Sequence, residues 1–445
     1  MTSRLLILGA GELGTACALS LLANMGSRGA QAGAVVTMCA RDKDYLQELQ
    51  LGSKTFRLFD RSIHVPSEMS FQVMGEEPAE KPTHCKASFL CLPVSCFAEA
   101  KGATPHEETP ACVRECLIRN ANAPLFVFVR GFSREGLTPV EEINRVIRPQ
   151  PSRVVVVSGP LFAREWAAAS LPENSTTTAA TSGSSSSSSS HASNSNSGVS
   201  LAFAMADETE AETLQAMRDL SQRLWHRESV TWLTEPNAAG ILSFVNGCFP
   251  LCCMGAGMVS SEYPASVSAM MSYMQHAIGA TEELVNQAFS RPHGTPLPAC
   301  ATATLAMACT NHASREFIFG RRLNYHFRHR DAIRAVFPGN SHASLDATVA
   351  GIHTLLKRLS FSSPFYEVLM DAFLTVLRAS VAGRGLVKTG FYDYRDHACM
   401  EDAPLLQHAL AVDAAMLSGD ETSFNRAREA LAMAFSNPVA PSSGL

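Results

Sequence analysis

The sequence lacks an excess of basic residues. Its 36 lysine and arginine residues are outnumbered by 41 aspartate and glutamate residues, which gives a formal net charge of −5 at pH 7 and a pI near 6.3. Proteins that bind nucleic acids usually carry a basic patch, often with aromatic side chains between the cations, and no such stripe occurs here. We therefore expect no nucleic-acid partner.

Metal-binding motifs are also missing. The 13 cysteines are scattered, several of them inside apolar segments, and none forms a Cys-x-x-Cys pair or a His/Cys cluster with metal-ligand spacing. This usage is typical of reduced thiols that serve as small apolar residues in an intracellular compartment. We expect no bound metal.

The sequence shows neither a membrane-spanning segment nor a signal peptide. No apolar run approaches the roughly 20 residues that span a bilayer, and the first expected strand starts too close to Met1 to leave room for a signal peptide. We expect a soluble, cytoplasmic protein without a membrane partner. The C-terminal Ser-Gly-Leu at residues 443–445 resembles a peroxisome-type address, but its basic middle residue is absent.

The opening stretch of the chain carries the clearest motif. An apolar run at residues 4–8 leads into Gly-Ala-Gly-Glu-Leu-Gly at residues 9–14, and a helical pattern follows over 15–25. In this context Gly9 makes a tight turn, Gly11 lets the backbone approach a pyrophosphate, and Gly14 lets the helix pack closely on the strand. The helix N-terminus then faces the diphosphate. The motif predicts a dinucleotide-binding domain.

The second predicted strand, at residues 34–40, ends in Arg41 and Asp42. An acidic residue at this place favours the free 2′-hydroxyl of NAD, whereas an arginine can receive the 2′-phosphate of NADP. Because both residue types are present, NAD and NADP both stay open. The two charges are equally consistent with a solvated helix cap.

Further strands are expected at residues 87–92, 125–129 and 153–157, alternating with helical segments. Such alternation predicts a parallel sheet, whose ligand lies beyond the carboxyl ends of the strands. The segments that follow these strands should therefore line one cleft. Two later strands, at 200–205 and 229–233, extend the sheet.

The composition divides the rest of the chain. Residues 170–198 are rich in serine, threonine, asparagine and glycine, a composition that cannot form a core, and we expect a disordered insertion. Beyond residue 236 only helical patterns follow. The predicted fold is an α/β Rossmann-like N-terminal domain with a parallel sheet, followed by an all-α C-terminal domain. The expected parts are a dinucleotide-binding domain (1–236), a helical substrate domain (237–380), and a helical extension with a loose tail (381–445).

Several motifs together resemble the NAD-dependent glycerol-3-phosphate dehydrogenase family. They are the glycine motif, Cys-Leu-Pro at residues 91–93, Arg-Gly-Phe at 130–132 in place of the family's Lys-Gly pair, and residues 157–165, which are close to Ser-Gly-Pro-x-x-Ala-x-Glu. Ser314-Arg315 and residues 363–367 continue the likeness. It covers roughly residues 1–380.

The resemblance implies a reaction and a set of site residues. Members of this family move a hydride between a nicotinamide and C2 of dihydroxyacetone phosphate or glycerol 3-phosphate. It thus implies NAD as cofactor, a small phosphorylated three-carbon substrate, and leaves a homodimer open. Arg315 would bind the substrate phosphate. The residues assigned to the cofactor are Gly9, Gly11, Gly14, Arg41, Pro93, Arg130 and Ala163.

The sequence departs from the family at the catalytic positions. Ser243 stands where the family has its lysine, Thr304 stands at the aspartate position, and no lysine occurs between Lys101 and Lys357. A serine hydroxyl does not replace an ammonium acid without a neighbouring base, and threonine supplies no carboxylate. Histidines occur in the second domain, but nothing in their spacing selects one.

Three hypotheses follow from this conflict. The chain is a divergent glycerol-3-phosphate dehydrogenase, a catalytically impaired relative that binds a dinucleotide as a sensor or scaffold, or a ketopantoate-reductase-like enzyme. Fold and resemblance favour an oxidoreductase, whereas the replaced catalytic positions favour the impaired relative.

Overall fold

The computed structural model describes most of residues 3–373. The predicted insertion lies outside the described residues apart from its first position, and so does the predicted C-terminal extension apart from residue 426. The described ranges are 3–26, 34–52, 55–58, 61–66, 68–74, 76, 85–94, 108–120, 122–147, 153–170, 199–226, 228–312, 314–328, 343–373 and 426.

The chain divides into two compact units, which are treated separately below. The first, called the sheet unit, comprises Met1–Leu92, Glu108–Val129 and Val140–Ser243. The second, called the helical unit, comprises Pro93–Glu107, Arg130–Pro139 and Phe244–Leu445. The loop 130–139 therefore belongs with the helices, although it directly follows a strand of the sheet.

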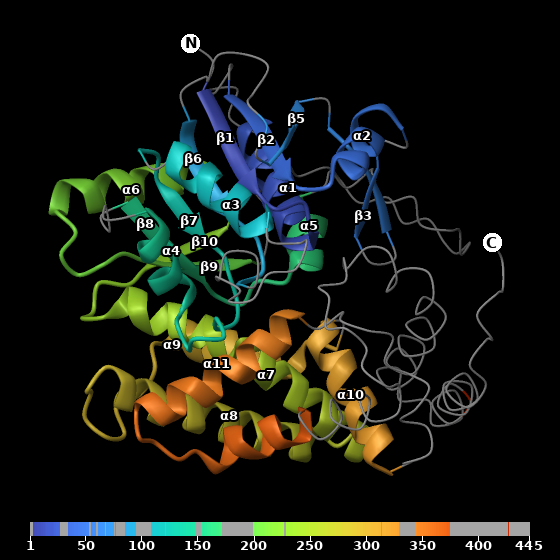
Figure 1. The fold of residues 1–445 in the computed structure, drawn as a ribbon, viewed down its shortest axis with the longest axis vertical. Helices are drawn as coiled ribbons and strands as arrows, with labels where there is room; N and C mark the ends of the chain where they lie inside the picture. Colours follow the sequence, from blue (N-terminus) through green and yellow to red (C-terminus); the bar gives the residue numbers. More distant parts are fainter. Residues whose placement is uncertain are drawn as a thin grey trace, which may run out of the picture. The chain divides into compact units, whose positions relative to one another are not determined.

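The sheet unit is built on an eight-stranded sheet with the order β10-β9-β8-β7-β6-β1-β2-β5 (Figure 1). Six neighbouring strands are parallel, which confirms the predicted Rossmann-like class. The strands are β1 (Ser3–Leu8), β2 (Ala34–Ala40), β5 (Met69–Val73), β6 (Cys85–Leu90), β7 (Leu125–Val127), β8 (Val154–Ser158), β9 (Ser200–Ala204) and β10 (Ser229–Trp232).

Two features of the sheet differ from the sequence prediction. β9 runs antiparallel to β8, and β10 runs parallel to β9, so that this edge is reversed. The apolar pattern of a strand is the same in either direction, and it therefore could not reveal the reversal. The sequence analysis also missed β5 and a short antiparallel pair, β3 (Thr55–Leu58) with β4 (Arg61–His64).

Six helices belong to the described part of the sheet unit. α1 packs against α5 and also contacts α6, so these three cover the same face. An aromatic cluster that includes Phe126, Phe203 and Trp225 fills the core beneath them. The helices are α1 (Glu12–Gly26), α2 (Lys43–Leu51), α3 (Glu108–Arg119), α4 (Pro139–Ile147, whose first residue belongs to the helical unit), α5 (Ala163–Ser170) and α6 (Ala211–Leu224).

A buried carboxylate fixes α1 in this layer. Glu228, the residue before β10, accepts hydrogen bonds from Ser20 Oγ at 2.7 Å, Asn24 Nδ2 at 3.1 Å and Trp166 Nε1 at 3.1 Å. Ser20 and Asn24 lie on α1 and Trp166 lies on α5. Because buried charged groups are retained only with such partners, this contact holds the two helices in one arrangement.

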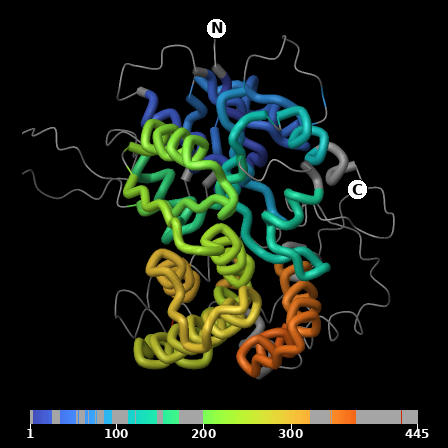
Figure 2. Tube along the Cα trace, turned by 90° about the vertical axis from the view of Figure 1, so that its left-hand side faces the viewer, coloured from blue at the N-terminus to red at the C-terminus, as the bar shows by residue number. Residues whose placement is uncertain are grey.

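The described helical unit contains helices only, as predicted (Figure 2). They are α7 (Ala238–Glu262), α8 (Val267–Ala288), α9 (Ala299–Thr310), α10 (Arg315–Arg328), α11 (Ala343–Arg358) and a final helical segment at 364–373. α7 starts in the sheet unit, because its first residues, up to Ser243, are grouped there.

α7 corrects one prediction about apolar runs. Among the described residues it is the one helix that is long and apolar enough to cross a membrane by length and composition. It has 25 residues, and an 18-residue window of it has a mean hydropathy of 1.5. The expectation that no apolar run approaches 20 residues was therefore wrong. Of that window, 94% is buried inside the structure, so the helix lies in the core of the protein.

Candidate functional site

The turn between β1 and α1 has the geometry that its glycines predict. Gly9 adopts φ +118°, and a Cβ atom there would lie 2.7 Å from the carbonyl oxygen of Cys91. A Cβ atom on Gly14 would lie 1.9 Å from the carbonyl oxygen of Gly9. Only glycine fits both positions, because one needs a left-handed backbone and the other brings α1 onto the end of β1.

Gly11 is different, because the fold itself does not require it. The residue is exposed, and a Cβ atom built on it meets nothing within 4 Å. α1 begins at the next residue, and the first amides of a helix lack intrahelical partners. The open backbone and these amides fit a diphosphate, which is held at a helix N-terminus by N–H groups and by the helix dipole.

Neighbouring strand ends come together beside this turn. Gly9 N donates to Cys39 O and Cys91 N donates to Leu8 O, each at 2.9 Å. β1 lies between β2 and β6. Successive strands are added on one side of β1 up to β5 and on its other side from β6 onward, so the strand order reverses at this point. Open α/β sheets bind ligands at such a switch point, beyond the carboxyl ends of the strands. Pro93, three residues after β6, is exposed and is the first residue of the helical unit, so its assignment to the cofactor remains a prediction.

Two further predicted cofactor residues, Ala163 and Arg41, belong to the sheet unit together with the glycine turn. Ala163 is the first residue of α5, which packs against α1. Arg41 is the first residue beyond β2, and it is exposed. Their assignment to the cofactor remains a prediction.

Arg130 is a half-buried cation in the helical unit. Its guanidinium carbon lies 3.7 Å from the centre of the Phe249 ring, which is close enough for a cation–π contact. Burial lowers the pKa of Arg130, while Cys253 and Glu316 raise it. An arginine still carries its charge at neutral pH, so the site holds a positive charge in apolar surroundings.

The backbone after Arg130 is anchored to two helices. Gly131 N donates to Asn246 O on α7 at 3.0 Å, and Phe132 N donates to Thr348 Oγ1 on α11 at 3.3 Å. The Phe132 ring lies edge-on to Phe244, with 5.1 Å between the centroids. The sequence analysis missed these partners. In the sequence, the glycine at position 131 indicated a turn, and in the structure Gly131 adopts φ +96°.

Neither residue at the family's catalytic positions presents a free hydroxyl to solvent. Ser243 is 1% exposed, and its Oγ accepts a hydrogen bond of 3.4 Å from Val140 N in the first turn of α4. Thr304 is fully buried and donates to the carbonyl oxygen of Cys300 at 2.8 Å. Both hydroxyls therefore serve the backbone.

Replacement of Ser243 by alanine should affect stability rather than chemistry. We expect Ser243→Ala to lower the free energy of unfolding by about 1 kcal/mol, because one helix-start amide loses its acceptor. Any turnover should remain within about twofold of the parent protein, since the hydroxyl is not available to a substrate. Denaturant unfolding and an NADH or NADPH oxidation assay test this. A selective loss of turnover would instead identify Ser243 as a catalytic residue.

Arg315 is exposed at the first position of α10. Ser314 Oγ accepts a hydrogen bond of 3.1 Å from Phe317 N and so caps this helix. Nearby, His312 packs edge-on against Phe317, and burial, with a smaller effect of Arg321, lowers the pKa of its imidazole. The lowered pKa disfavours the imidazolium, which is the usual acid form of a catalytic histidine.

His276, His293 and Cys252 are poor candidates for the missing proton donor. His276 contacts the carbonyl oxygen of Ser272 on its own helix at 2.7 Å, and His293 is exposed. Burial raises the pKa of Cys252 to about 12, which keeps it a protonated, unreactive thiol. In the described ranges, no group of three His, Cys, Asp or Glu side chains could hold a metal ion.

A family comparison supports the sequence resemblance. Residues 4–186 match the family model described as the N-terminus of NAD-dependent glycerol-3-phosphate dehydrogenase. The match confirms the resemblance, and with it the cofactor class, for this part of the chain. No curated protein matches the sequence.

Solved structures resemble the chain in fold at low sequence identity. A glycerol-3-phosphate dehydrogenase of Plasmodium falciparum aligns with a TM-score of 0.55 and 11% identity, over 87% of this chain and 97% of that one. DsGPDH of Dunaliella salina aligns at 0.50 and 12%, over 99% and 62%. A 2-dehydropantoate 2-reductase of Porphyromonas gingivalis W83 aligns with a TM-score of 0.42 and 10% identity, over 84% of this chain and 100% of that one. The first two support the fold.

Proposed function

We propose that the chain is an NAD(P)-dependent oxidoreductase that interconverts dihydroxyacetone phosphate and glycerol 3-phosphate. The observation that carries the proposal is the open backbone at Gly11, at the start of α1 and within the part that matches the family. The bound nicotinamide dinucleotide supplies the group that gives or takes the hydride. The protein binds and orients both reactants.

Arg315 is the proposed ligand of the substrate phosphate. A guanidinium can hold a phosphate through two parallel hydrogen bonds, and the N-terminus of α10 adds a favourable dipole. The Ser314 cap fixes the first turn of that helix, which limits the freedom of the arginine backbone. Arg130 keeps its positive charge and would therefore not act as the proton donor.

The proton for the substrate oxygen needs another source. Ser243 and Thr304 are buried and bonded to backbone groups, so we propose that water supplies this proton. A positioned general acid usually contributes about 10²- to 10⁴-fold to a rate. We therefore expect turnover to be slower by roughly this factor than in an enzyme that has the lysine.

The burial of Ser243 and Thr304 favours a second candidate function. A chain that keeps the glycine turn but buries both catalytic positions could bind a dinucleotide without turnover, as a sensor or scaffold. A ketopantoate-reductase-like activity has no contact in the described residues that would favour it.

A homodimer and a cytoplasmic location complete the proposal, and light scattering after size-exclusion chromatography tests the dimer.

Two measurements on the full chain distinguish the candidates. Oxidation of NADH or NADPH is followed with dihydroxyacetone phosphate, and the shift in thermal unfolding is recorded with each dinucleotide alone. We expect both stabilisation and slow, enzyme-dependent oxidation. Stabilisation without oxidation would leave the second candidate, and the loss of both would overturn both candidates.

The proposed role of Arg315 gives a separate prediction. Arg315→Gln should raise the KM for dihydroxyacetone phosphate at least about tenfold, because a charge-assisted bidentate contact to phosphate is lost. Dinucleotide-induced stabilisation should not change. Lys357→Gln, which removes an exposed cation at the end of α11, is the control and should leave KM within about twofold. Equal effects of the two substitutions would contradict this role.

A further inference from the structure

One stripe of α8 is mainly apolar along the whole helix but is buried at one end only. Its members follow one another at intervals of four and three residues, the spacing of a helix face that packs against another helix. They are Val267, Met271, Met274, Ile278, Thr281 and Val285, called the α8 stripe below. Thr281 and Val285 are fully buried, whereas Val267 is 71% and Met271 46% exposed. The first half of the α8 stripe is therefore open to solvent.

The final helical segment, residues 364–373, lies beside α8. The Tyr366 hydroxyl forms a hydrogen bond of 2.6 Å with Thr281 Oγ1, in the buried half of the α8 stripe. One residue earlier, the Phe365 ring lies 5.5 Å from the ring of Tyr273. The last continuous stretch of the described chain thus ends in a segment that packs on this helix.

The open half of the α8 stripe lies in a stretch without formal charge. Residues 263–281 contain no Asp, Glu, Lys or Arg. Of the six large apolar residues that are exposed in the described ranges, three fall at its start: Tyr263, Val267 and Met271. Methionine and tyrosine are enriched and charges are depleted at the centres of protein interfaces. A gathered apolar surface of this kind indicates an interaction site.

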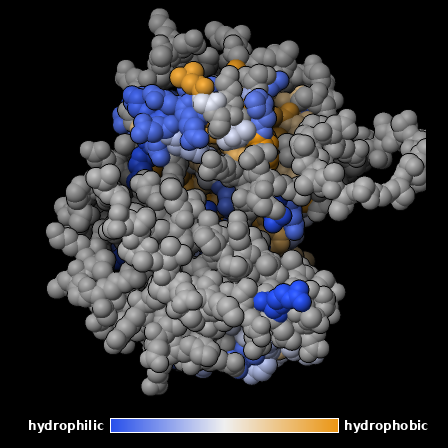
Figure 3. All heavy atoms as spheres, turned by 90° about the vertical axis from the view of Figure 1, so that its right-hand side faces the viewer, coloured by the Kyte–Doolittle hydropathy of each residue, from blue (hydrophilic) through white to orange (hydrophobic). Residues whose placement is uncertain are grey.

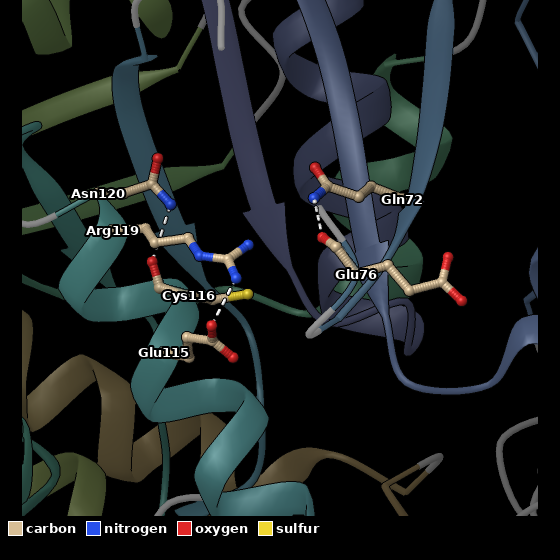
Figure 4. A network of polar contacts seen from close by, with 6 residues as sticks. All are labelled: Gln72, Glu76, Glu115, Cys116, Arg119 and Asn120. Carbon is tan, nitrogen blue, oxygen red and sulfur yellow. Dashed lines mark hydrogen bonds and ion pairs between the residues drawn. The ribbon is translucent and has the colours of Figure 1, made fainter. Parts of the chain in front are cut away.

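Exposed apolar residues of the sheet unit are isolated by comparison. Ile118 on α3 precedes Arg119, which forms an ion pair with Glu115 on the same helix (Figure 4). Leu51 ends α2, and hydrophilic surface gathers in the upper part of the side seen in Figure 3, the side on which Figure 1 places α2. Single apolar residues among polar ones are common on protein surfaces and need no partner.

A stripe of matching spacing occurs in the sequence of the C-terminal extension. Within residues 422–435, apolar residues recur at intervals of three and four, at Phe424, Ala427, Leu431 and Ala434, and Phe435 widens this side. Asn425, Arg426 and Glu429 fall on the opposite side of the same helical pattern, and Arg428 falls at its edge. Arg426 is helical and exposed in the structure, as the polar side of such a pattern predicts.

The chain is long enough to bring this segment to α8. Forty-eight residues separate residue 373 from residue 422. A coil of this length spans about 40 Å on average, whereas a 22-residue helix such as α8 is about 33 Å long. Both partners belong to the helical unit. A segment tethered in this way also binds at a high effective concentration.

We propose that residues 422–435 form a helix that packs on the open half of the α8 stripe of the same chain. Phe424, Leu431 and Phe435 contact the exposed valine and methionines, so that apolar burial and contacts between sulfur and aromatic rings hold the helix. The charged side of the segment faces solvent. The extension is thus a structural part of the helical unit, and this inference requires neither a dinucleotide nor a substrate.

Hydrogen–deuterium exchange of the full chain, followed by mass spectrometry, tests the proposal. The amides of residues 422–435 should exchange at least about tenfold more slowly than those of an unfolded peptide. Met271→Glu and Leu431→Glu each place a charge in the contact, and each should speed this exchange by about tenfold or more. The amides of residues 277–286 should stay as protected as in the parent protein, which shows that α8 remains folded.

Two variants beside the stripes are matched controls. Ser272→Glu, at an exposed position of α8 outside the stripe, and Met433→Glu, on the polar side of the segment, should keep exchange at 422–435 within about twofold of the parent protein. An unprotected segment, or protection that survives Met271→Glu, would overturn the inference. So would protection that is lost on dilution of the protein, because a second copy would then cover the α8 stripe.

Discussion

Gly11→Val is expected to abolish the stabilisation of the protein by NADH or NADPH. The valine side chain would occupy the open space beyond the Gly11 backbone, where no atom of the protein lies within 4 Å of a Cβ position. A diphosphate displaced from the helix N-terminus loses hydrogen bonds to a charged group, each of which contributes about 1.5–3 kcal/mol. We expect affinity to fall by at least about 100-fold.

The same variant should fold normally, which separates binding from stability. Because the added atoms meet nothing in the protein, the melting temperature without cofactor should stay within about 2 °C of the parent protein. Gly14→Ala is the matched contrast, since its Cβ would lie 1.9 Å from Gly9 O and should destabilise the protein even without cofactor. Unchanged stabilisation of Gly11→Val by the dinucleotide would place the cofactor elsewhere.

The sequence predicted the parts of the fold that repeat a strong local pattern. The first two strands, the glycine turn and the start of α7 were expected within a few residues of their observed bounds. Each combines an apolar run with an abrupt change at glycine, proline or a charged residue. β3 and β4 were missed because they are short and polar, and because their pairing is decided by tertiary contacts rather than by propensity.

The candidate site was predictable on the cofactor side only. The different demands on Gly9, Gly11 and Gly14 follow from a local turn, which the sequence specifies by itself. The roles of Ser243 and Arg130 depend instead on partners far along the chain, in α4 and α7. A single sequence does not show which distant residue supplies an amide or an aromatic ring.

The glycines of α7 form an intermediate case. Two glycines, one on α7 and one on α10, let these helices pack closely. A Cβ atom on Gly257 would lie 1.9 Å from Phe317 O on α10, and a Cβ atom on Gly320 of α10 would lie 1.8 Å from Met254 O on α7. The two helices thus approach each other backbone to backbone, each through a glycine of its own. A single sequence does not identify α10 as the helix that α7 meets.

This crossing leads to the second large prediction. Gly257→Ala or Gly320→Ala would force the α7 and α10 backbones apart by roughly 1 Å or more, and we expect each to lower the free energy of unfolding by about 3 kcal/mol. Gly279→Ala on α8 is the matched control, because a Cβ there meets nothing within 4 Å. It should stabilise the protein by about 0.5–1 kcal/mol, the difference in helix propensity. Urea unfolding measures all three.

The crossing should also matter for the proposed substrate site, because α10 carries Arg315 at its first position. If α10 moves away from α7, the arginine backbone moves with it, and the KM for dihydroxyacetone phosphate should rise in Gly320→Ala. Dinucleotide-induced stabilisation should persist, since the glycine turn belongs to the sheet unit.

Because both glycines serve one contact, the double variant should lose less stability than the sum of the single variants. Additive losses would show that the two contacts are independent.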